Sequence, residues 1–344
     1  MTRTALYSGE FIWQSSVIMN EPPDYYLLLG VAFDADETDV RAAFAKAIKK
    51  WHPDTSQGEN GDRARFLIEA RDILTDPARR RAYDAERQQG SLIRSSARSA
   101  SQWIFVCSQG LGQFLTIREA LEAAKDGDKI YVLPGTYRES VIKVEKSVEL
   151  AGQGSADEDV ILESEDDILY LQADGATIRG LFFRTLAARR FAVRANSNLG
   201  TISACRFFGP EGTGLLIEGE SRLLVEGCSF ENCRLGVRVE DARPAILTSK
   251  FTANTTGLLV RSGCDCVVEN NDFADNEGAS IEIQADTSAR VSRNRFRGGT
   301  AGIVAHQTSR GSIEHNHFFG HSERSGILFP DGVTEAVVRL NHFE

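Results

Sequence analysis

The sequence has 344 residues, a formal net charge of −10 at pH 7 and an isoelectric point near 5.3. A chain of this length can form two or three domains, each with its own core. The acidic balance argues against nucleic acid as the main partner, because phosphate binding requires clustered positive charge.

The N-terminal region and the hydropathy pattern favour a cytoplasmic protein. Residues 1–22 contain Glu10 and lack a basic start followed by a sustained apolar run, so they do not resemble a signal peptide. No run of 18 apolar residues occurs, so we expect no membrane-spanning helix and no membrane partner. Residues 1–22 are interpreted as a disordered tail, and Met19 is an alternative to Met1 as the first translated residue.

The first strongly periodic segment is predicted to be a helix that begins near Glu37. Asp36 can accept hydrogen bonds from the free amides of the first turn, and Asp39 lies where the helix dipole favours an acid. The apolar residues on one face of this helix are Val40, Phe44, Ala47, Ile48 and Trp51. The basic residues that fall largely away from that face are Arg41, Lys46, Lys49 and Lys50. Pro53 lacks a backbone N–H and restricts the residue before it, so the helix ends near His52.

A second amphipathic helix is predicted after a polar loop at residues 54–62. It ends before Asp76, and its apolar residues are Phe66, Ile68, Ala70, Ile73 and Leu74. Two helices of this length joined by a short loop form an antiparallel pair.

The tripeptide His52-Pro53-Asp54 lies in the loop between the two long helices, and the pair Tyr83-Asp84 follows the second of them. This combination resembles the J-domain of DnaJ-type co-chaperones over residues 23–88. The resemblance implies that residues 25–31 form the family's short first helix and residues 76–84 its closing helix. A tripeptide of this kind is common by chance. Its position between two correctly spaced helices is not, and the resemblance is therefore specific.

The resemblance implies a binding surface for a DnaK-type heat-shock chaperone. His52, Pro53 and Asp54 would stimulate the ATPase of that chaperone, and the basic residues of the helix before them would dock on its acidic surface. These docking residues are Arg41, Lys46 and Lys49. A basic helix face alone is most often only a solvated surface, so the docking role depends on the tripeptide. Trp51 replaces the tyrosine more usual in the family, which changes packing rather than the contact loop.

Residues 89–102 are rich in Ser, Gln, Arg and Ala without apolar periodicity, and we interpret them as a flexible linker. Beyond them, over residues 103–344, phenylalanine marks a repeat of 21 to 25 residues. The repeated residues are Phe183, Phe207, Phe230, Phe251, Phe273, Phe296, Phe318 and Phe343. An aliphatic residue lies five positions before each of them. This period predicts a solenoid with one coil per repeat.

Short β-branched segments follow the phenylalanines and predict a further strand in each coil, as at residues 214–217, 236–239 and 257–260. Parallel strands about 4.8 Å apart place equivalent positions directly above one another. The phenylalanines should then form an internal stack. A ladder of amides at a bend is expected from Asn271, Asn294, Asn316 and Asn341.

The predicted fold class is therefore multidomain. An N-terminal all-α J-domain, formed by an antiparallel helical hairpin with two short flanking helices, precedes an all-β right-handed parallel β-helix.

The start of the solenoid is predicted to carry a capping helix over residues 117–125, which Thr116 and Glu119 open as a capping box. The run from Thr116 to Glu139 resembles the opening of pectin methylesterases and other pectate-lyase-like β-helices. The catalytic segments of those enzymes have no match in this sequence. The resemblance thus implies the fold without enzymatic activity, and we expect neither a cofactor nor a metal.

A strip of charged residues is expected on the outer face of the strand that follows each phenylalanine. Its outward positions are Glu218, Glu240, Arg261, Gln284 and His306, with Arg238 and Glu282 in the neighbouring row. Polysaccharide-active relatives bind sugar on such a strip, so a glycan groove is one interpretation. Cross-strand ion pairs are the simpler one, because the sequence offers no close, apolar-walled carboxylate pair for glycoside hydrolysis.

Three other polar clusters are given ordinary interpretations. A solvated acidic turn is expected at Glu163, Glu165, Asp166 and Asp167. Exposed turn positions explain four histidines of the last two coils as well as a metal site would, namely His315, His317, His321 and His342. The six cysteines contain no CxxC pair, which favours buried, reduced thiols over a zinc site, and Cys264 to Cys266 is expected on a turn.

The leading hypothesis is a non-catalytic J-domain co-chaperone whose β-helix recognises an unknown client or tethers the chaperone to a site. The alternative is a carbohydrate-binding or carbohydrate-active β-helix protein with an accessory J-domain, and a structural assembly rod is a third possibility. The last coil ends one residue after Phe343 without a capping helix. Its open strand edges predict self-association through that coil or coverage by a partner.

Overall fold

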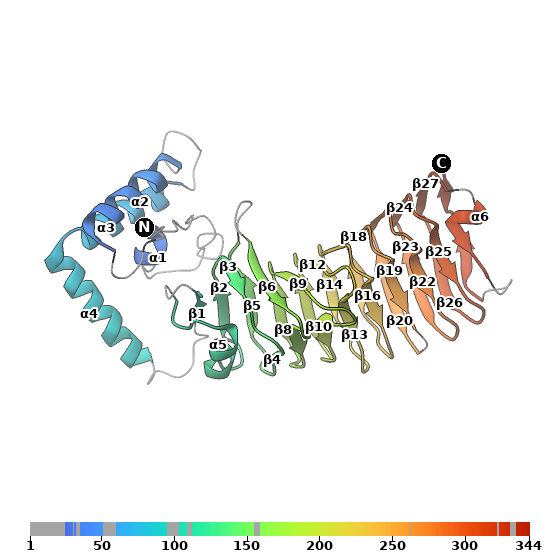
Figure 1. Cartoon of the computed structure of the whole chain (residues 1–344), viewed down its shortest axis with the longest axis horizontal. Helices are drawn as coiled ribbons and strands as arrows, with labels where there is room; N and C mark the ends of the chain where they lie inside the picture. Colours follow the sequence, from blue (N-terminus) through green and yellow to red (C-terminus); the bar gives the residue numbers. More distant parts are fainter. Residues whose placement is uncertain are drawn as a thin grey trace. The chain divides into compact units, whose positions relative to one another are not determined.

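The computed structural model describes residues 25–29, 31, 35–50, 60–94, 103–108, 112–154, 159–261, 263–321, 323–330 and 335–344. They form two compact units, a helical unit before residue 95 and a solenoid unit from residue 103 (Figure 1). Each unit has its own hydrophobic core. In the part of the chain that is described, no helix is long and apolar enough to cross a membrane.

The helical unit consists of helices α1 Tyr25–Leu29, α2 Glu37–Lys50, α3 Asn60–Leu74 and α4 Pro77–Arg94. Helix α2 begins where predicted, because Asp36 Oδ1 accepts hydrogen bonds from the amides of Thr38 (2.8 Å) and Asp39 (2.9 Å). Asp76 caps α4 through the amides of Ala78 and Arg79. Pro77 fits the first position of α4, where a backbone N–H would have no helical partner.

Helices α1, α2 and α4 all contact α3, and the core lies between them. The core residues are Tyr25, Tyr26, Leu29, Val31, Ala35, Val40, Ala43, Leu67, Ala70 and Leu74. The apolar face predicted for α3 is wrong at one position, since Ile68 is 42% exposed and Leu67 is buried instead. Leu67, Ala70 and Leu74 follow the three-then-four spacing of a single helix face, and Ile68 lies about 100° away from it.

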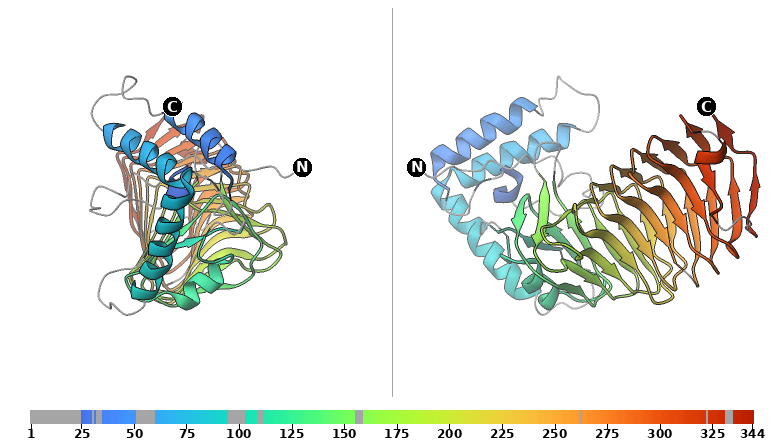
Figure 2. Two further views of the ribbon diagram at one scale, coloured as in Figure 1. Left: turned by 90° about the vertical axis from the view of Figure 1, so that its left-hand side faces the viewer. Right: turned by 45° about the vertical axis from the view of Figure 1, so that its right-hand side comes forward.

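Three parallel sheets run along the solenoid, and each complete coil gives one strand to sheet A, then one to sheet B and one to sheet C (Figure 2). Sheet A contains β1 Trp103–Val106, β2 Lys129–Val132, β5 Glu149–Gly152, β8 Ala176–Arg179, β11 Gly200–Ser203, β14 Leu224–Glu226, β17 Ala245–Leu247, β20 Asp265–Glu269, β23 Ser288–Ser292, β26 Arg310–Glu314 and β29 Val337–Arg339. Sheet B contains β3 Gly135–Tyr137, β6 Val160–Ser164, β9 Phe182–Thr185, β12 Arg206–Phe208, β15 Ser229–Glu231, β18 Lys250–Thr252, β21 Asp272–Ala274, β24 Arg295–Arg297, β27 His317–Phe319 and β30 His342–Phe343. Sheet C contains β4 Ile142–Val144, β7 Leu169–Leu171, β10 Phe191–Ala195, β13 Thr213–Ile217, β16 Leu235–Val239, β19 Thr256–Val260, β22 Ala279–Ile283, β25 Ala301–Ala305 and β28 Ile327–Leu328.

The phenylalanine stack predicted from the repeat is confirmed. Each repeated phenylalanine of sheet B lies directly over the one in the next coil, as Phe207 does over Phe230. Ring centroids from Phe183 to Phe343 are 4.6 to 5.2 Å apart and the rings are nearly parallel. From Phe183 onwards the stack fills the interior behind sheet B, and it fixes the register of these coils because a slip of one residue would turn every ring outward.

The bend between sheets A and B holds the predicted amide ladder. The residue before each ladder position has a positive φ, for example 57° at Asn270 and 55° at Arg293. Asn294 Nδ2 donates to Val268 O (2.9 Å) and to Asn316 Oδ1 (3.0 Å). Asn294 Oδ1 accepts from the backbone and side-chain amides of Asn271 (2.9 and 3.0 Å). The side chains thus satisfy backbone groups that the bend removes from the sheets.

A second ladder, not predicted, lies at the bend between sheets B and C, three residues after the stacked phenylalanines. Asn276 Oδ1 accepts from the backbone amide of Asn254 (3.1 Å) and from its side-chain amide (3.0 Å). Cys233 and His321 occupy the same position in other coils and are also buried. His321 Nε2 lies 3.0 Å from Gly298 O, so the exposed turn expected for this histidine is wrong.

The start of the solenoid carries the expected capping helix, α5 Ile117–Ala123, which ends two residues earlier than predicted. Its capping box is present, with Thr116 and Glu119 each accepting from the other's backbone amide. Lys146 Nζ donates to the carbonyls of Leu121, Glu122 and Ala124 and so caps the other end. A short helix, α6 Glu323–Gly326, precedes β28.

Two other expectations about polar residues are wrong, that of the acidic turn only at Glu163 and Asp167, since Glu165 and Asp166 are exposed as expected. In the segment predicted as a solvated acidic turn, Glu163 is only 6% exposed and lies 2.8 Å from an Arg138 nitrogen, and Asp167 is also buried. Asp167 accepts hydrogen bonds from the Tyr170 hydroxyl and the Phe191 amide. Cys266 is not on a turn but in strand β20, where burial raises its pKa.

Candidate functional site

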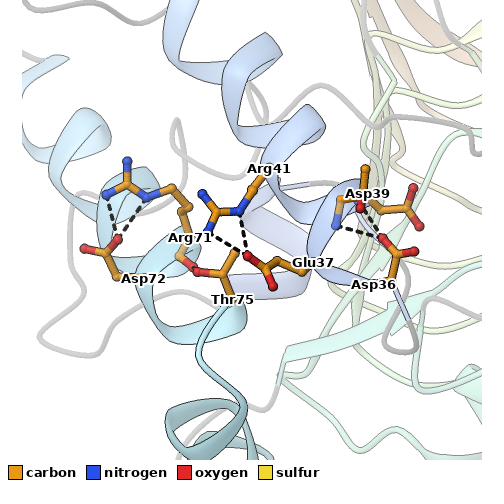
Figure 3. A network of polar contacts seen from close by, with 8 residues as sticks. Asp36, Glu37, Asp39, Arg41, Arg71, Asp72 and Thr75 are labelled. Atoms are coloured by element: carbon orange, nitrogen blue, oxygen red, sulfur yellow. Dashed lines mark hydrogen bonds and ion pairs between the residues drawn. The ribbon is translucent and has the colours of Figure 1, made fainter.

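The surface of helix α2 is the first candidate site, because all three predicted docking residues belong to this helix. Arg41 is 62% exposed on its side chain, and its Nε donates to Glu37 Oε1 (2.8 Å) one turn earlier (Figure 3). Lys46 and Lys49 lie in the second half of α2, but their side chains are outside the described residues. His52, Pro53 and Asp54 are also outside the described residues, between the end of α2 and the start of α3 in the sequence.

Contacts between α2 and α3 hold the two helices that flank the tripeptide. The Arg71 guanidinium lies over the Phe44 ring, 4.6 Å from its centroid. Arg71 also donates to Asp72 Oδ1 (2.9 and 2.6 Å), which orients the guanidinium (Figure 3). Thr75 closes the end of α3 by donating its hydroxyl to Arg71 O (2.8 Å). The described part of this site is therefore a braced helical frame with a basic side chain on its exposed face.

A second set of contacts joins α4 to α1 and explains the Tyr83-Asp84 pair found in the sequence. The Tyr26 hydroxyl donates to Asp84 Oδ1 (2.9 Å) and accepts from Arg80 Nε (2.9 Å). Arg80 Nη1 donates to Ala35 O (2.7 Å). The Tyr83 hydroxyl accepts from the Tyr25 amide (3.0 Å). Burial, and then the hydrogen bond with Asp84, raise the pKa of Tyr26, so its hydroxyl remains a donor.

We expect Arg80→Ala to lower the free energy of unfolding of the helical unit by about 2–3 kcal/mol, because two charge-assisted hydrogen bonds are lost and the Ala35 carbonyl loses its partner. Thermal unfolding followed by circular dichroism at 222 nm would measure this. Arg79→Ala is the matched control, since Arg79 is exposed and pairs with Asp76 only at 3.9 Å. Equal effects of the two substitutions would show that the Tyr26 contacts are not stabilising.

The charged strip predicted on the solenoid lies on the outer face of sheet C, and its acids pair with basic side chains of the same sheet. Arg194 Nη2 donates to Glu218 Oε2 (3.1 Å). Glu240 accepts from Arg238 Nε (2.8 Å) and Arg261 Nη1 (2.6 Å).

Glu282, the remaining acid of the strip, is also paired. The pairing of Glu240 lowers the pKa of its carboxyl. Glu282 lies 3.7 Å from His306 Nε2. Partial burial raises the pKa of Glu240, but the two arginines outweigh it and lower the pKa of this carboxyl overall. This pairing is the arrangement expected of cross-strand ion pairs.

No cluster of three or more metal-binding side chains is found among the residues that the structure describes. The six cysteines are free and buried, as expected. Burial raises the pKa of Cys233 to about 12, so this thiol is unreactive at neutral pH.

Two family models match the chain. The DnaJ domain model matches residues 24–84, which span α1, α2, α3 and the first part of α4. The model of the right handed beta helix region matches residues 169–343, just over half of the chain. The chain belongs to the right-handed β-helix family. Its helical unit carries a DnaJ domain, so the predicted fusion of a J-domain to a parallel β-helix is confirmed.

Individual relatives match one part of the chain each. The chaperone protein DnaJ of Thermoplasma volcanium is 39% identical over 83 residues, which cover 23% of this chain and 22% of that protein. The chain spans about a fifth of the length of the curated relatives it matches.

Solved structures resemble the β-helix. An alginate lyase from a Paenibacillus species covers 70% of this chain and 95% of its own, with a TM-score of 0.52 at 16% identity. This likeness shows the fold alone. A pectin methylesterase from carrot covers 72% of this chain and 84% of its own, with a TM-score of 0.46 at 13% identity.

Sequence reasoning missed a basic groove on the outer face of sheet B. Asp272, Arg295 and His317 occupy neighbouring positions on strands β21, β24 and β27. A signal was available, because each of these residues directly precedes a stacked phenylalanine and must therefore face outward.

Proposed function

We propose that this protein is a J-domain co-chaperone of a DnaK-type heat-shock chaperone in the cytoplasm, and that its β-helix recognises a client or tethers the chaperone to a site. The match of the DnaJ domain model to residues 24–84 carries the proposal. In this proposal residues 23–88 act as the J-domain, 89–102 as a linker and 103–344 as a non-catalytic β-helix.

The J-domain would engage the ATP-bound chaperone with the tripeptide and with helix α2. Positive charge on Arg41, Lys46 and Lys49 would steer α2 towards an acidic surface. Releasing Arg41 from Glu37 costs little, because an exposed ion pair of this kind is worth only about 0.3–0.5 kcal/mol. His52, Pro53 and Asp54 would then accelerate ATP hydrolysis, so that the client held by the β-helix becomes trapped by the chaperone.

The carbohydrate alternative has weaker support. Its proposed ligand face consists of Glu218, Arg238, Glu240, Arg261, Glu282 and His306. The acids of this face pair with bases of the same sheet, so a sugar would have to displace these pairs. A protein client that binds elsewhere on the β-helix does not have to displace the ion pairs of sheet C.

Single-turnover ATP hydrolysis by the cognate DnaK-type chaperone tests the co-chaperone proposal. We expect the intact protein to raise the rate at least about tenfold, which corresponds to about 1.4 kcal/mol of activation free energy. His52→Gln should abolish the increase, because it removes the imidazole that the resemblance assigns to stimulation. Raising the ionic strength should weaken it, because the docking of α2 is electrostatic.

His342→Gln is the matched control, with the same change of side chain at an exposed position of the β-helix. It should stimulate as the unchanged protein does. If neither the intact protein nor this control accelerates hydrolysis, the co-chaperone proposal fails. If His52→Gln stimulates normally, the role assigned to the tripeptide fails.

A further inference from the structure

The basic groove lies on the outer face of sheet B, at its bend towards sheet A, and has a volume of about 790 Å³. That size falls within the range of about 300–1,000 Å³ typical of ligand sites. Its lining comes from three successive coils. The first gives Asp272, the second gives Arg293, Arg295 and Arg297, and the third gives His315, His317 and Phe319. Arg293 and His315 stand at the positive-φ positions of the bend, which project from the corner of the solenoid.

The arginines of this groove differ from those of sheet C in their pairing. Arg293 pairs with Glu269 beside the groove. Arg295 and Arg297 have no carboxylate within 4.0 Å among the residues that the structure describes, and both are exposed. On a chain whose net charge is −10, two unneutralised arginines side by side form a local site for an anion.

The spacing of the two arginines favours one class of anion. Arg295 and Arg297 are alternate residues of strand β24, so their Cα atoms are about 6.6 Å apart. Alternate side chains of an extended peptide have the same spacing, and each guanidinium can bind one carboxylate through two parallel hydrogen bonds. Phe319 pairs with Arg297 on the adjoining strand and is only half-buried, so it adds an apolar contact. An inorganic anion would leave that contact unused.

We propose that this groove binds an extended peptide segment whose acidic residues stand at alternate positions and face the arginines, with an apolar residue beside them that contacts Phe319. The inference deepens the proposed function and rests on it, since it identifies the chemistry of the client segment that the β-helix holds. A long polyanion such as nucleic acid fits less well. Asp272 lines the groove, and Glu269 and Glu314 stand on the sheet A strands β20 and β26 leading to the bend, so phosphates extending past the arginines would meet negative charge.

Fluorescence anisotropy on the full-length protein tests the inference with a labelled peptide of alternating glutamate and valine that ends in phenylalanine. We expect Arg295→Gln and Arg297→Gln each to weaken binding about tenfold, and the double variant more, because each removes one bidentate contact. Arg206→Gln is the matched control. It lies in the same outward row of sheet B as Arg295, but it pairs with Asp159 at 2.9 Å, and we expect its affinity to stay within about twofold.

Several results would overturn the inference. The first is equal binding of a peptide that has lysine in place of glutamate. The second is unchanged affinity of the double variant for the acidic peptide. The third is displacement of the labelled peptide by inorganic phosphate or trigalacturonate at a lower concentration than by unlabelled peptide. Thermal unfolding of each variant shows whether lost binding comes from lost folding.

The same protein samples are assayed for ATPase stimulation, which separates the two proposals. Lost peptide binding with normal stimulation in the double variant supports both. Peptide binding without stimulation by the unchanged protein refutes the co-chaperone role and leaves the ligand class standing.

Discussion

Asn294→Ala is expected to lower the free energy of unfolding of the β-helix by about 3–5 kcal/mol. The Asn294 side chain is fully buried and makes four hydrogen bonds, two as donor and two as acceptor. Alanine would take the Asn294 partner from the backbone amide of Asn271 and from the carbonyl of Val268 in a site that water cannot reach. The Asn271 side-chain amide would keep only its bond to Ile246 O. Chemical denaturation of the full-length protein, followed by the circular dichroism signal of the β-strands, would measure the loss.

Two further substitutions sharpen this prediction. Asn294→Ser should lose less, because Ser249 already occupies the equivalent position and its hydroxyl accepts from the Cys228 amide at 3.1 Å. Asn198→Ala, at an exposed position, should change stability by less than about 0.5 kcal/mol. A loss at Asn294 no larger than at Asn198 would contradict the view that the ladder stabilises the bend.

Phe273→Ala should also cost about 3–5 kcal/mol, for a different reason. The ring is fully buried between Phe251 and Phe296, with centroids 4.6 and 5.0 Å away. Gly257 lies across the interior from this ring, and a Cβ added at Gly257 would be only 3.2 Å from the Phe273 ring. The neighbouring rings therefore have no room to shift and fill the cavity left by alanine. Hydrogen exchange should show the largest loss of protection in the coils on either side, since each coil contacts only its neighbours.

Phe208→Ala is the control for the second prediction. Phe208 belongs to the same sheet but faces outward and is partly exposed, so its loss should cost less than about 1 kcal/mol. Phe273→Leu keeps most of the buried volume and should fall between the two. Equal effects at Phe208 and Phe273 would mean that the stack does not stabilise the β-helix.

The features predictable from the sequence are those that repeat or that carry local capping chemistry. The stacked phenylalanine recurs in every coil from Phe183 to Phe343, so the sequence shows the same pattern many times. Asp36 and Thr116 accept hydrogen bonds from amides two or three residues away, so their capping roles can be predicted from the neighbouring sequence. The family of the helical unit was visible for the same reason, since its tripeptide and closing pair are short motifs.

The features that were missed depend on residues far apart in the sequence. Glu163 is buried because arginines from the coils on both sides, Arg138 and Arg184, surround its carboxylate. The second ladder contains asparagine only at Asn254 and Asn276, too few positions to form a visible repeat. The groove depends on which arginines lack a carboxylate neighbour, which the sequence alone does not specify.

The identical stacking of successive coils has a consequence for how this protein can change over generations. Duplication or loss of one whole coil, about 22 residues, would leave the phenylalanine stack and both amide ladders in register. A gene encoding such a chain can therefore lengthen or shorten its β-helix in single steps without redesigning the interior. Outward residues such as Arg295 and Arg297 are free to diverge from coil to coil, so new binding surfaces can arise on an unchanged frame while the J-domain stays the same.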